Sequence, residues 1–269
     1  MLRMPAVAGQ FYPANPQELR SLVRQCSRQS SEKSKSRVKA CLVPHAGYVY
    51  SGSVAGEVFT RIEIPQKVIV LGVRHFPRGE NAAILADGSW RTPLGDAAID
   101  AQLAQKCKDE CTLLKEDTVA HSQEHSLEVQ LPFLQVLSPG FTFVPIALGT
   151  IRFEELQNVG EAIARVISGA EREVLLLTTS DLNHYEDDAT TRKKDAMAIE
   201  QLEAMNPQAL YEVCRAESIS MCGLGPVVAM LFALRALGAT RAEMVQYATS
   251  AAVSGDCRRV VGYAGMIFD

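Results

Sequence analysis

The feature that most constrains this fold is a series of short apolar runs separated by stretches with helical periodicity. The runs are rich in valine, isoleucine and leucine and predict buried strands at residues 38–43, 67–72, 82–86, 141–148, 173–179, 243–249 and 260–268. The amphipathic stretches between them predict helices over roughly 16–29, 53–62, 98–108, 127–137, 152–168, 190–204 and 225–237, and Asn206–Pro207 is typical of a further helix start. This alternation indicates an α/β sandwich in which helices flank a central mixed, largely parallel sheet. Because no long linker interrupts the pattern, we expect a single domain over residues 1–269.

Composition narrows the classes of partner that we expect. The chain has 269 residues, of which 47% are hydrophobic and 22% charged, and its net charge is −4. This balance suits a large core and does not favour a nucleic-acid partner. The basic stretch at 28–37 is interrupted by serines and indicates a solvated loop. The apolar stretch 226–234 meets Arg235 well short of a membrane span, so we expect no membrane partner.

Seven cysteines occur without the paired spacing of a disulfide scaffold. The amino terminus also lacks the uninterrupted apolar core of a signal peptide. We therefore expect reduced thiols and a cytoplasmic location. Cys107 and Cys111 have C-x3-C spacing, but a zinc site of this kind needs a second pair, which the sequence lacks.

Three of the five histidines follow predicted strands closely. His45, His75 and His184 each come a few residues after an apolar run, and Asp181 accompanies His184. Ligands of open α/β sheets bind outside the carboxyl ends of the strands, so parallel neighbours would bring these side chains into one pocket. A single histidine after a strand is more often an ordinary loop residue, but three in the same position favour a shared site. Imidazoles suit iron, copper and zinc, and they also serve as acids or bases near neutral pH.

The remaining histidines lie in the stretch HSQEH at 121–125, which has the spelling of an inverted zinc-protease motif. That chemistry requires both histidines on one helical face. Pro132 limits how far a regular helix extends towards the amino terminus, and Ser126 looks like a cap. We therefore expect a loop here and disfavour a protease, although Glu124 and His125 can reach the pocket from that loop.

Other common site motifs give weaker signals. The sequence contains neither G-x-x-x-x-G-K-[ST] nor G-x-G-x-x-G for phosphates, and no G-x-S-x-G for a serine hydrolase. CGLGPVVA at 222–229 indicates a turn and a helix start, whose free N–H groups could hold an anion.

Several longer motifs occur in order along nearly the whole chain. They are RMPAVAGQFYP, PHAGYVYSG, LGVRH, TPLGD, EHSLEVQLPFLQ, SDLNHY, MCGLGP and VVGYAG. By these motifs the chain resembles the Memo family, and more closely its prokaryotic branch, AmmeMemoRadiSam system protein B. The resemblance implies a fold like that of the LigB-like class III extradiol dioxygenases. Those enzymes hold non-haem Fe(II) with two histidines and a carboxylate at the mouth of an α/β sheet, and another histidine acts as acid and base.

The resemblance also implies roles for particular residues. His45 is the first candidate metal ligand and His75 the second. His184, with Asp181 beside it, matches the acid–base position, and His125 with Glu124 matches a motif near the pocket. We name His184, Asp181 and His125 as candidate catalytic residues. In the animal branch the corresponding pocket binds iron or copper, so we expect Fe(II) or copper here.

The chain departs from the family pattern around the second histidine. Relatives usually carry a small polar residue where this chain has Arg74, whose charge would repel a cation or favour an anion. The animal branch has a further histidine ligand where this chain has Phe76.

The third protein ligand is not identified by the resemblance. Relatives usually have an acidic residue at the place of Ala252, and the animal branch uses a cysteine at the place of Val253. Neither side chain here can bind a metal. Asp256 and Cys257 lie close by in the sequence and are the substitutes that the pattern offers.

Two functional hypotheses follow. The first is a metal-dependent, dioxygenase-like or redox enzyme with an unknown substrate. The second is a binding or accessory protein whose pocket recognises a small molecule, an anionic peptide or a partner protein through Arg74 and the histidines. The prokaryotic genes tend to accompany a radical SAM protein and an AMMECR-type protein, which are therefore the expected partners.

Overall fold

The computed structural model describes residues 1–28, 35–149 and 152–269, and most of the basic stretch at 28–37 lies outside them. The strands are β1 (Leu2–Arg3), β2 (Ala40–Val43), β3 (Lys67–Val73), β4 (Ala82–Ile84), β5 (Ser89–Thr92), β6 (Gly95–Ile99), β7 (Lys115–Glu116), β8 (Thr142–Leu148), β9 (Val174–Thr179), β10 (His184–Glu186), β11 (Ala242–Thr249) and β12 (Val260–Phe268). The helices are α1 (Pro16–Cys26), α2 (Tyr48–Arg61), α3 (Ala101–Glu110), α4 (Thr118–Ser122), the 3-10 helix η1 (Glu128–Gln130), α5 (Leu131–Leu137), α6 (Phe153–Ser168), α7 (Asp188–Glu203), α8 (Pro207–Ala216), α9 (Leu224–Ala236) and α10 (Ala251–Ser254).

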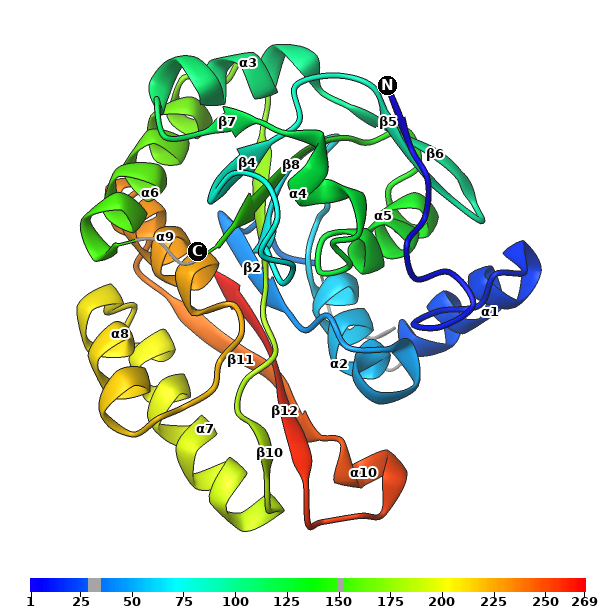
Figure 1. The fold of residues 1–269 in the computed structure, drawn as a ribbon, viewed down its shortest axis with the longest axis vertical. Helices are drawn as coiled ribbons and strands as arrows, with labels where there is room; N and C mark the ends of the chain where they lie inside the picture. Colours follow the sequence, from blue (N-terminus) through cyan, green and yellow to red (C-terminus); the bar gives the residue numbers. More distant parts are fainter. Residues whose placement is uncertain (29–34, 150–151) are drawn as a thin grey trace.

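The strands form one mixed sheet in the order β1-β5-β6-β8-β3-β9-β2-β12-β10, with β11 beside β12 (Figure 1). The central strands β8, β3, β9 and β2 are parallel to one another. Strand β12 runs antiparallel to both β2 and β11. The central strands are almost wholly buried, which explains why they read as continuous apolar runs in the sequence. The predicted α/β class is confirmed.

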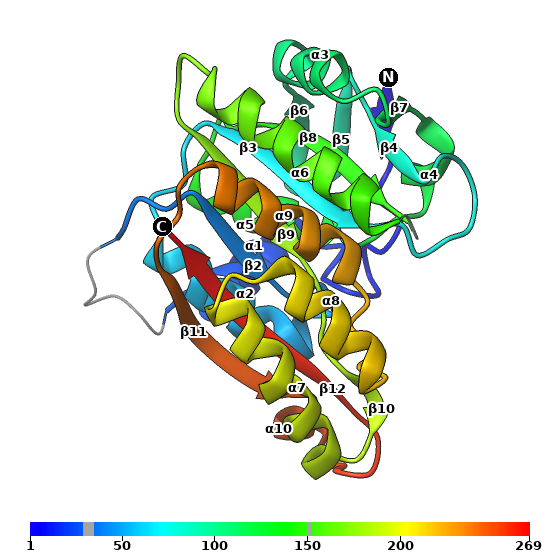
Figure 2. The ribbon, with the colours of Figure 1, turned by 90° about the vertical axis from the view of Figure 1, so that its left-hand side faces the viewer.

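Helices cover both faces of this sheet. On one face, helix α9 packs on the central strands, and α6 and α8 pack on α9 (Figure 2). On the other face, α2 packs on β2, β11 and β12, and α1 packs on α2. Helix α9 is buried almost all round because it lies between the sheet and these outer helices. No helix within the described ranges has the length and apolarity that a membrane crossing requires.

The apolar strands and most helices fall where the sequence predicts them. Five strands without a long apolar run were not predicted, namely β1, β5, β6, β7 and β10, and neither were the short helices α4 and α10. The predicted helix at 127–137 is divided into η1 and α5, with Pro132 in the first turn of α5. The prediction that Ser126 caps this helix is wrong. Its Oγ instead donates to the carbonyl of Val73 and accepts from the N–H of Val73, both at 3.1 Å, at the end of β3.

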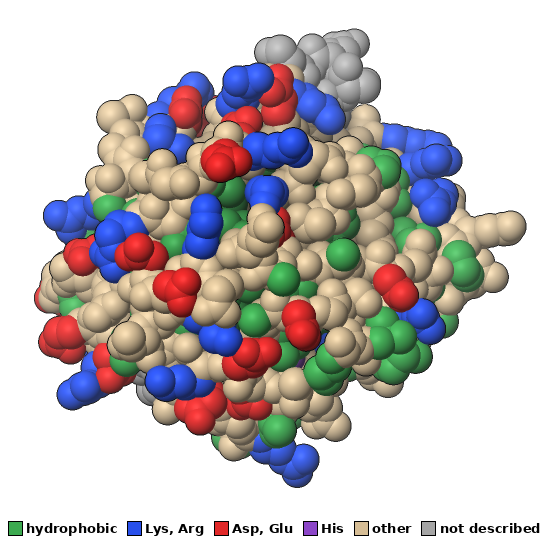
Figure 3. Space-filling view, turned by 90° about the horizontal axis from the view of Figure 1, so that it is seen from above, with side chains coloured by type: hydrophobic (Ala, Val, Ile, Leu, Met, Phe, Trp, Pro, Cys, Tyr) green, Lys and Arg blue, Asp and Glu red, His purple; other side chains and the backbone are tan. Residues whose placement is uncertain are grey.

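Charged side chains of both signs are interspersed on the face seen from above (Figure 3). No broad area of a single sign is visible on that face, and such mixed surfaces do not attract a polyanion strongly.

Asp195 of α7 provides a pH-dependent element of stability. Its side chain is fully buried, and it accepts hydrogen bonds from the Asn183 N–H at 2.9 Å and the Tyr247 hydroxyl at 2.7 Å. Burial raises the pKa of Asp195 from 3.8 to about 6, although both hydrogen bonds act in the opposite direction. The folded state therefore binds the Asp195 proton more tightly than the unfolded state does. The contribution of this group to stability must consequently fall as the pH rises from about 4 to about 6.

We expect Asp195→Asn to be more stable than the wild type above pH 6 by about 3 kcal/mol, which is the upper limit set by the pKa change. The two proteins should be close in stability below about pH 3, where the carboxyl is protonated in both states. Urea unfolding across this pH range measures the difference. An identical pH dependence for the two proteins would contradict this account of Asp195.

Candidate metal centre

Three neighbouring parallel strands deliver polar side chains to the same edge of the sheet. Strands β3, β9 and β2 are adjacent, in that order. They end at residues 73, 179 and 43, and His75, Asp181 and His45 each lie two residues further along the chain. His184 begins β10, which continues from the same end of β9. The strand-end pattern therefore brings these four side chains together, as the sequence predicts.

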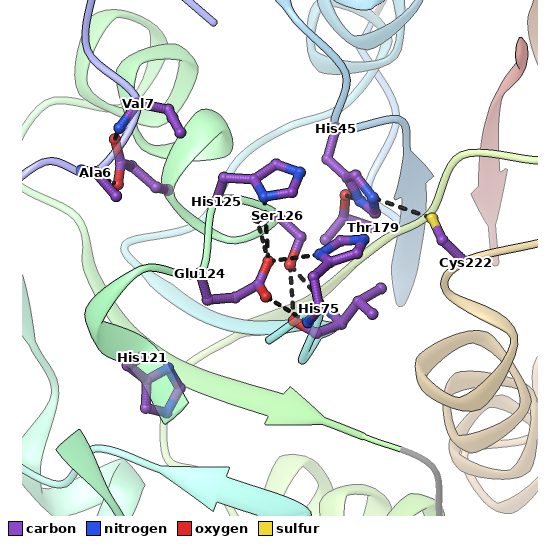
Figure 4. A network of polar contacts seen from close by, with 12 residues as sticks. Ala6, Val7, His45, His75, His121, Glu124, His125, Ser126, Thr179 and Cys222 are labelled. Atoms are coloured by element: carbon purple, nitrogen blue, oxygen red, sulfur yellow. Dashed lines mark hydrogen bonds and ion pairs between the residues drawn. The ribbon is translucent and has the colours of Figure 1, made fainter. Parts of the chain in front are cut away.

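The side chains surround a cavity of about 570 Å³, a volume typical of a small-molecule site. It is lined by Phe11, His45, Ala46, Gly47, His75, His125, Asp181, His184, Tyr185, Ser220, Cys222 and Val261. The ring centroids of His45 and His75 lie 5.1 Å apart, and His125 stacks on His75 at 4.5 Å (Figure 4). Four of the five histidines thus share one pocket.

The rings of His45 and His75 are held through their Nδ1 atoms. His75 Nδ1 donates to Glu124 Oε1 at 2.9 Å, and His45 Nδ1 lies 2.8 Å from Thr179 Oγ1. The His75 N–H donates to the other Glu124 oxygen at 2.6 Å. These contacts fix both ring orientations and leave Nε2 of each ring to serve the cavity. A carboxylate behind a histidine in this manner is a common support for metal-ligating histidines.

His184, which also lines the cavity, is held by a similar arrangement. Its Nδ1–H donates to the carbonyl of Ser220 at 2.9 Å, and its backbone N–H donates to Ser220 Oγ at 2.8 Å. With the proton on Nδ1, the Nε2 atom is left to face a ligand. The next residue, Tyr185, is 65% exposed and has a φ of 65°, which is strained for a tyrosine. Strained backbone of this kind is concentrated at functional sites.

The segment 124–130 supports the pocket by binding to His75 and to the ends of β2 and β3. Glu124 holds His75, Ser126 pairs with the end of β3, and Gln130 donates to the Pro44 carbonyl at 3.0 Å. The close approach of this segment requires Gly72, because a Cβ there would lie 2.8 Å from Ser126 Oγ. The family motif around residue 124 is therefore a structural support for the ends of β2 and β3.

Burial and mutual charge set the protonation of the pocket. Burial lowers the pKa of His45 to about 3, and the neighbouring His75 acts in the same direction. Burial likewise lowers the pKa of His125 to about 4. Burial alone would raise the pKa of Glu124, but the hydrogen bond and charge of His75, together with His125 and the Ser126 N–H, outweigh it and bring the pKa to about 2. Burial raises the pKa of Asp181. At neutral pH the rings of His45 and His125 are therefore uncharged, and each has a nitrogen lone pair that can bind a metal ion.

Cys222 is a pocket residue that sequence reasoning missed. It lies between α8 and α9, and its Sγ is 3.1 Å from His45 Nε2. The ligand atoms of His45, His75 and Cys222 lie within 4.8 Å of one another (Figure 4). Two further groups of this type occur among the described residues, His75–Glu124–His125 and Asp181–His184–Cys222. Its only signal in the sequence is the motif MCGLGP, which indicates a turn and a helix start and does not by itself point to the pocket.

Arg74, which the sequence placed in the pocket, faces away from it. Successive side chains leave a strand end on opposite sides, so Arg74 points away when His75 points in. Its guanidinium donates to the Gly79 carbonyl at 3.1 Å and to Asn81 Oδ1 at 2.6 Å. It lines an adjoining cavity with Tyr211 rather than the histidine pocket. The charge expected to repel a cation is therefore directed elsewhere.

The substitutes offered for the third ligand also lie outside the pocket lining. Asp256 is paired with Arg258 Nη2 at 2.8 Å, and Cys257 is exposed. Val253 is 51% exposed on α10, and Phe76 is 41% exposed. Neither Asp256 nor Cys257 can contribute to the pocket in this arrangement, because β12 and α10 direct that loop outward.

His121 is the histidine that stays outside the pocket. It is fully buried on α4 against Trp90, with a ring-centroid distance of 5.7 Å. Figure 4 shows it apart from His45, His75, His125 and Glu124, which lie together. His121 and His125 do not share one helix, since α4 ends at Ser122. The arrangement required by the inverted zinc-protease motif is therefore absent from this described segment.

The fold and the pocket define a class: an α/β protein with a histidine-lined cavity at the carboxyl ends of its parallel strands. A family model described as Memo-like protein matches residues 3–267. A MEMO1 family protein of Methanopyrus kandleri is 39% identical over 280 residues, which cover 100% of this chain and 99% of the relative. One of Aquifex aeolicus is 40% identical, covering 99% of each chain. The chain belongs to the Memo family.

A solved structure shows the same fold at low sequence identity. An uncharacterized protein of Escherichia coli K12 superposes with a TM-score of 0.58 at 12% identity, over 86% of this chain and 100% of that chain. At this identity the likeness concerns the fold alone.

Proposed function

We propose that this chain is a metal-dependent redox enzyme of dioxygenase-like ancestry, in which His45 and His75 hold Fe(II) or copper. We assign it to the AmmeMemoRadiSam system protein B branch on the motifs quoted above. The proposal rests mainly on one observation, which is how the rings of His45 and His75 are held in place. Each is anchored through Nδ1 and offers Nε2 to a shared cavity.

The imidazole nitrogens of His45 and His75 are suitable ligands for Fe(II) or copper. Neutral imidazoles suit iron and copper, and the burial of His45 keeps it neutral. Glu124 orients His75 and places negative charge behind it, which strengthens the ring as a donor. A bound ion of this type supplies a Lewis-acidic, redox-active centre with positions open to substrate and dioxygen.

Other residues that line the cavity can bind and deprotonate a substrate. His184 keeps its proton on Nδ1, towards Ser220, so Nε2 is ready to accept a proton from a substrate hydroxyl. His125 also lines the cavity, where it stacks on His75 and contacts Phe11 at a centroid distance of 4.7 Å. Asp181 holds the loop of His45 by accepting its N–H at 2.8 Å.

The rim of the cavity points to a substrate with an apolar part. Phe11, Tyr185 and Val261 contribute apolar surface next to the histidines. A ligand with one flat or apolar portion and one ionisable oxygen would match both the rim and the polar floor. Recognition of an anionic peptide, the alternative function, loses its expected donor because Arg74 is bound to Gly79 and Asn81.

The test uses chain purified without oxygen. We expect about one iron or copper per chain by elemental analysis, and oxygen uptake with ascorbate as reductant that stops when a chelator removes the metal. His184→Gln should retain the metal and slow the uptake by about 100-fold, because it lacks the proton acceptor. A metal-free wild type that retains a radical SAM or AMMECR-type protein in a pull-down would contradict the proposal and favour the binding role.

A further inference from the structure

A second cavity, of about 270 Å³, adjoins the histidine pocket and is lined by charge of one sign. Its lining residues are Val73, Arg74, Leu148, Gly149, Leu156, Tyr211, Arg215, Met221, Cys222, Leu224, Gly225 and Pro226. Among the described residues, this wall contains two arginines and no aspartate or glutamate, and it has none of the histidines of the first pocket. A concave surface of this composition attracts an anion.

The end of β3 contributes Arg74 to this wall. Two neutral oxygens hold its guanidinium, the Gly79 carbonyl at 3.1 Å and Asn81 Oδ1 at 2.6 Å. These contacts occupy two of its five N–H groups and bring no negative charge to it. Its Nε is buried and has no hydrogen-bond partner among the described residues. A Cβ on Gly149 would lie 2.7 Å from this Nε, so glycine at 149 is what allows the side chain to lie here.

Helix α8 contributes the second positive charge. Arg215 Nη1 donates to the Tyr211 hydroxyl at 3.1 Å, and its guanidinium carbon lies 5.4 Å from the centroid of the Tyr211 ring. These contacts orient the Arg215 side chain along the helix but, like those of Arg74, supply no carboxylate. Because the Tyr211 oxygen is the acceptor in this pair, its own proton is available to a ligand.

The start of α9 adds a third electropositive element. Its first three residues, Leu224, Gly225 and Pro226, all line the cavity. No side chain within the described ranges caps this helix, so the positive end of its dipole is not compensated there. A helix start alone identifies no ligand, but here it lies in the same cavity wall as two arginines without carboxylate partners. Charge-assisted hydrogen bonds of this kind are the strong contacts that hold oxyanions.

We propose that this cavity binds a phosphate dianion, either as inorganic phosphate or as the phosphoryl group of a small phosphomonoester. Two guanidinium groups balance two negative charges, and their planar forks match phosphate oxygens. The volume of about 270 Å³ lies just below the usual range of small-molecule sites, which suits a small ligand or a single head group. The inference goes beyond the proposed redox function and does not depend on it.

Isothermal titration calorimetry with sodium phosphate near pH 8, where the dianion dominates, tests the site. The chain is first dialysed against a chelator, so that no ion in the histidine pocket can hold the phosphate. We expect one phosphate per chain with a Kd below about 1 mM, and weaker binding as sodium chloride is added. Arg74→Gln and Arg215→Ala should each weaken binding by about 10- to 100-fold, because each removes a charged donor. Acetate, with one charge, should bind at least about tenfold more weakly than phosphate.

Three further titrations complete the test. Arg24→Ala, which removes an exposed arginine of α1 outside the cavity, should match the wild type, and so should His45→Ala. Arg215 is exposed, so its variant tests the site even if Arg74→Gln fails to fold. Glycerol 3-phosphate distinguishes the two forms of the ligand: tighter binding than phosphate identifies a phosphomonoester, and weaker binding identifies inorganic phosphate.

Four results would overturn the proposal. They are no binding of either phosphate compound, equal binding of acetate and phosphate, unchanged affinity in Arg215→Ala, and loss of binding in His45→Ala with retention in Arg215→Ala. The last result would place the anion in the histidine pocket instead.

Discussion

Replacing Glu128 by alanine should lower the free energy of unfolding by about 3–5 kcal/mol, the range for breaking a buried ion pair. Glu128 is fully buried on η1, and it pairs with Arg3, which is 4% exposed. It also accepts from the N–H groups of Ala6 and Val7, at 2.8 and 3.1 Å. Alanine would leave the Arg3 charge without its counter-ion and both N–H groups without their acceptor in a dry environment. Guanidinium chloride unfolding monitored by circular dichroism measures the change.

This network also connects stability to the pocket. The amino-terminal segment that Glu128 holds includes Phe11, which lines the cavity, and Arg3 donates to the Glu124 carbonyl at 2.7 Å. The matched control is Asp96→Ala, which breaks the exposed pair with Arg91 and should cost no more than about 1 kcal/mol. A cost for Glu128→Ala as small as that of the control would refute this account.

Removing either ring at the centre of the pocket should lower the affinity for Fe(II) by at least about 1,000-fold. Changes to groups that only support a ligand cost about 10–100-fold, and loss of the ligand itself must cost more. We therefore expect His45→Ala and His75→Ala each to fail in competition with a chelator from which the wild type takes iron. Affinity is measured under anaerobic conditions with a chromophoric chelator.

His121→Gln is the matched control for these variants. His121 is buried like His45, but it lies outside the cavity, so its replacement should leave the affinity within about threefold of the wild type. Thermal melts of all three variants establish that each is folded. Equal iron affinity in His45→Ala and His121→Gln would exclude the histidine pocket as the metal site.

The parts of the fold that could be predicted are those with a local signal. Strands β3, β8 and β9 are buried on both faces, so each appears in the sequence as an unbroken apolar run. Strands β5 and β6 are short and carry exposed residues on alternate positions, and their pairing as a hairpin depends on the neighbouring β8 and β1. A short segment of mixed polarity has no comparable signal, and these two strands were missed.

The difference between local signals and long-range packing also explains which residues of the site could be predicted from the sequence. His45 and His75 could be placed together because parallel strands end at a common edge, which is a rule of the fold. Cys222 could not, because it arrives on a loop between two helices and its position depends on the packing of Gly223 against Ser180. The direction of Arg74 depends on the pleat at the very end of β3, which sequence spacing alone did not resolve.

The most direct measurement of the central claim is a crystal structure of the iron-loaded chain, prepared without oxygen, with anomalous scattering recorded at the iron edge. The account predicts one strong anomalous peak in the cavity, within bonding distance of Nε2 of His45 and Nε2 of His75. An iron peak at any other place, or an empty cavity in crystals of chain shown to contain iron, would contradict it.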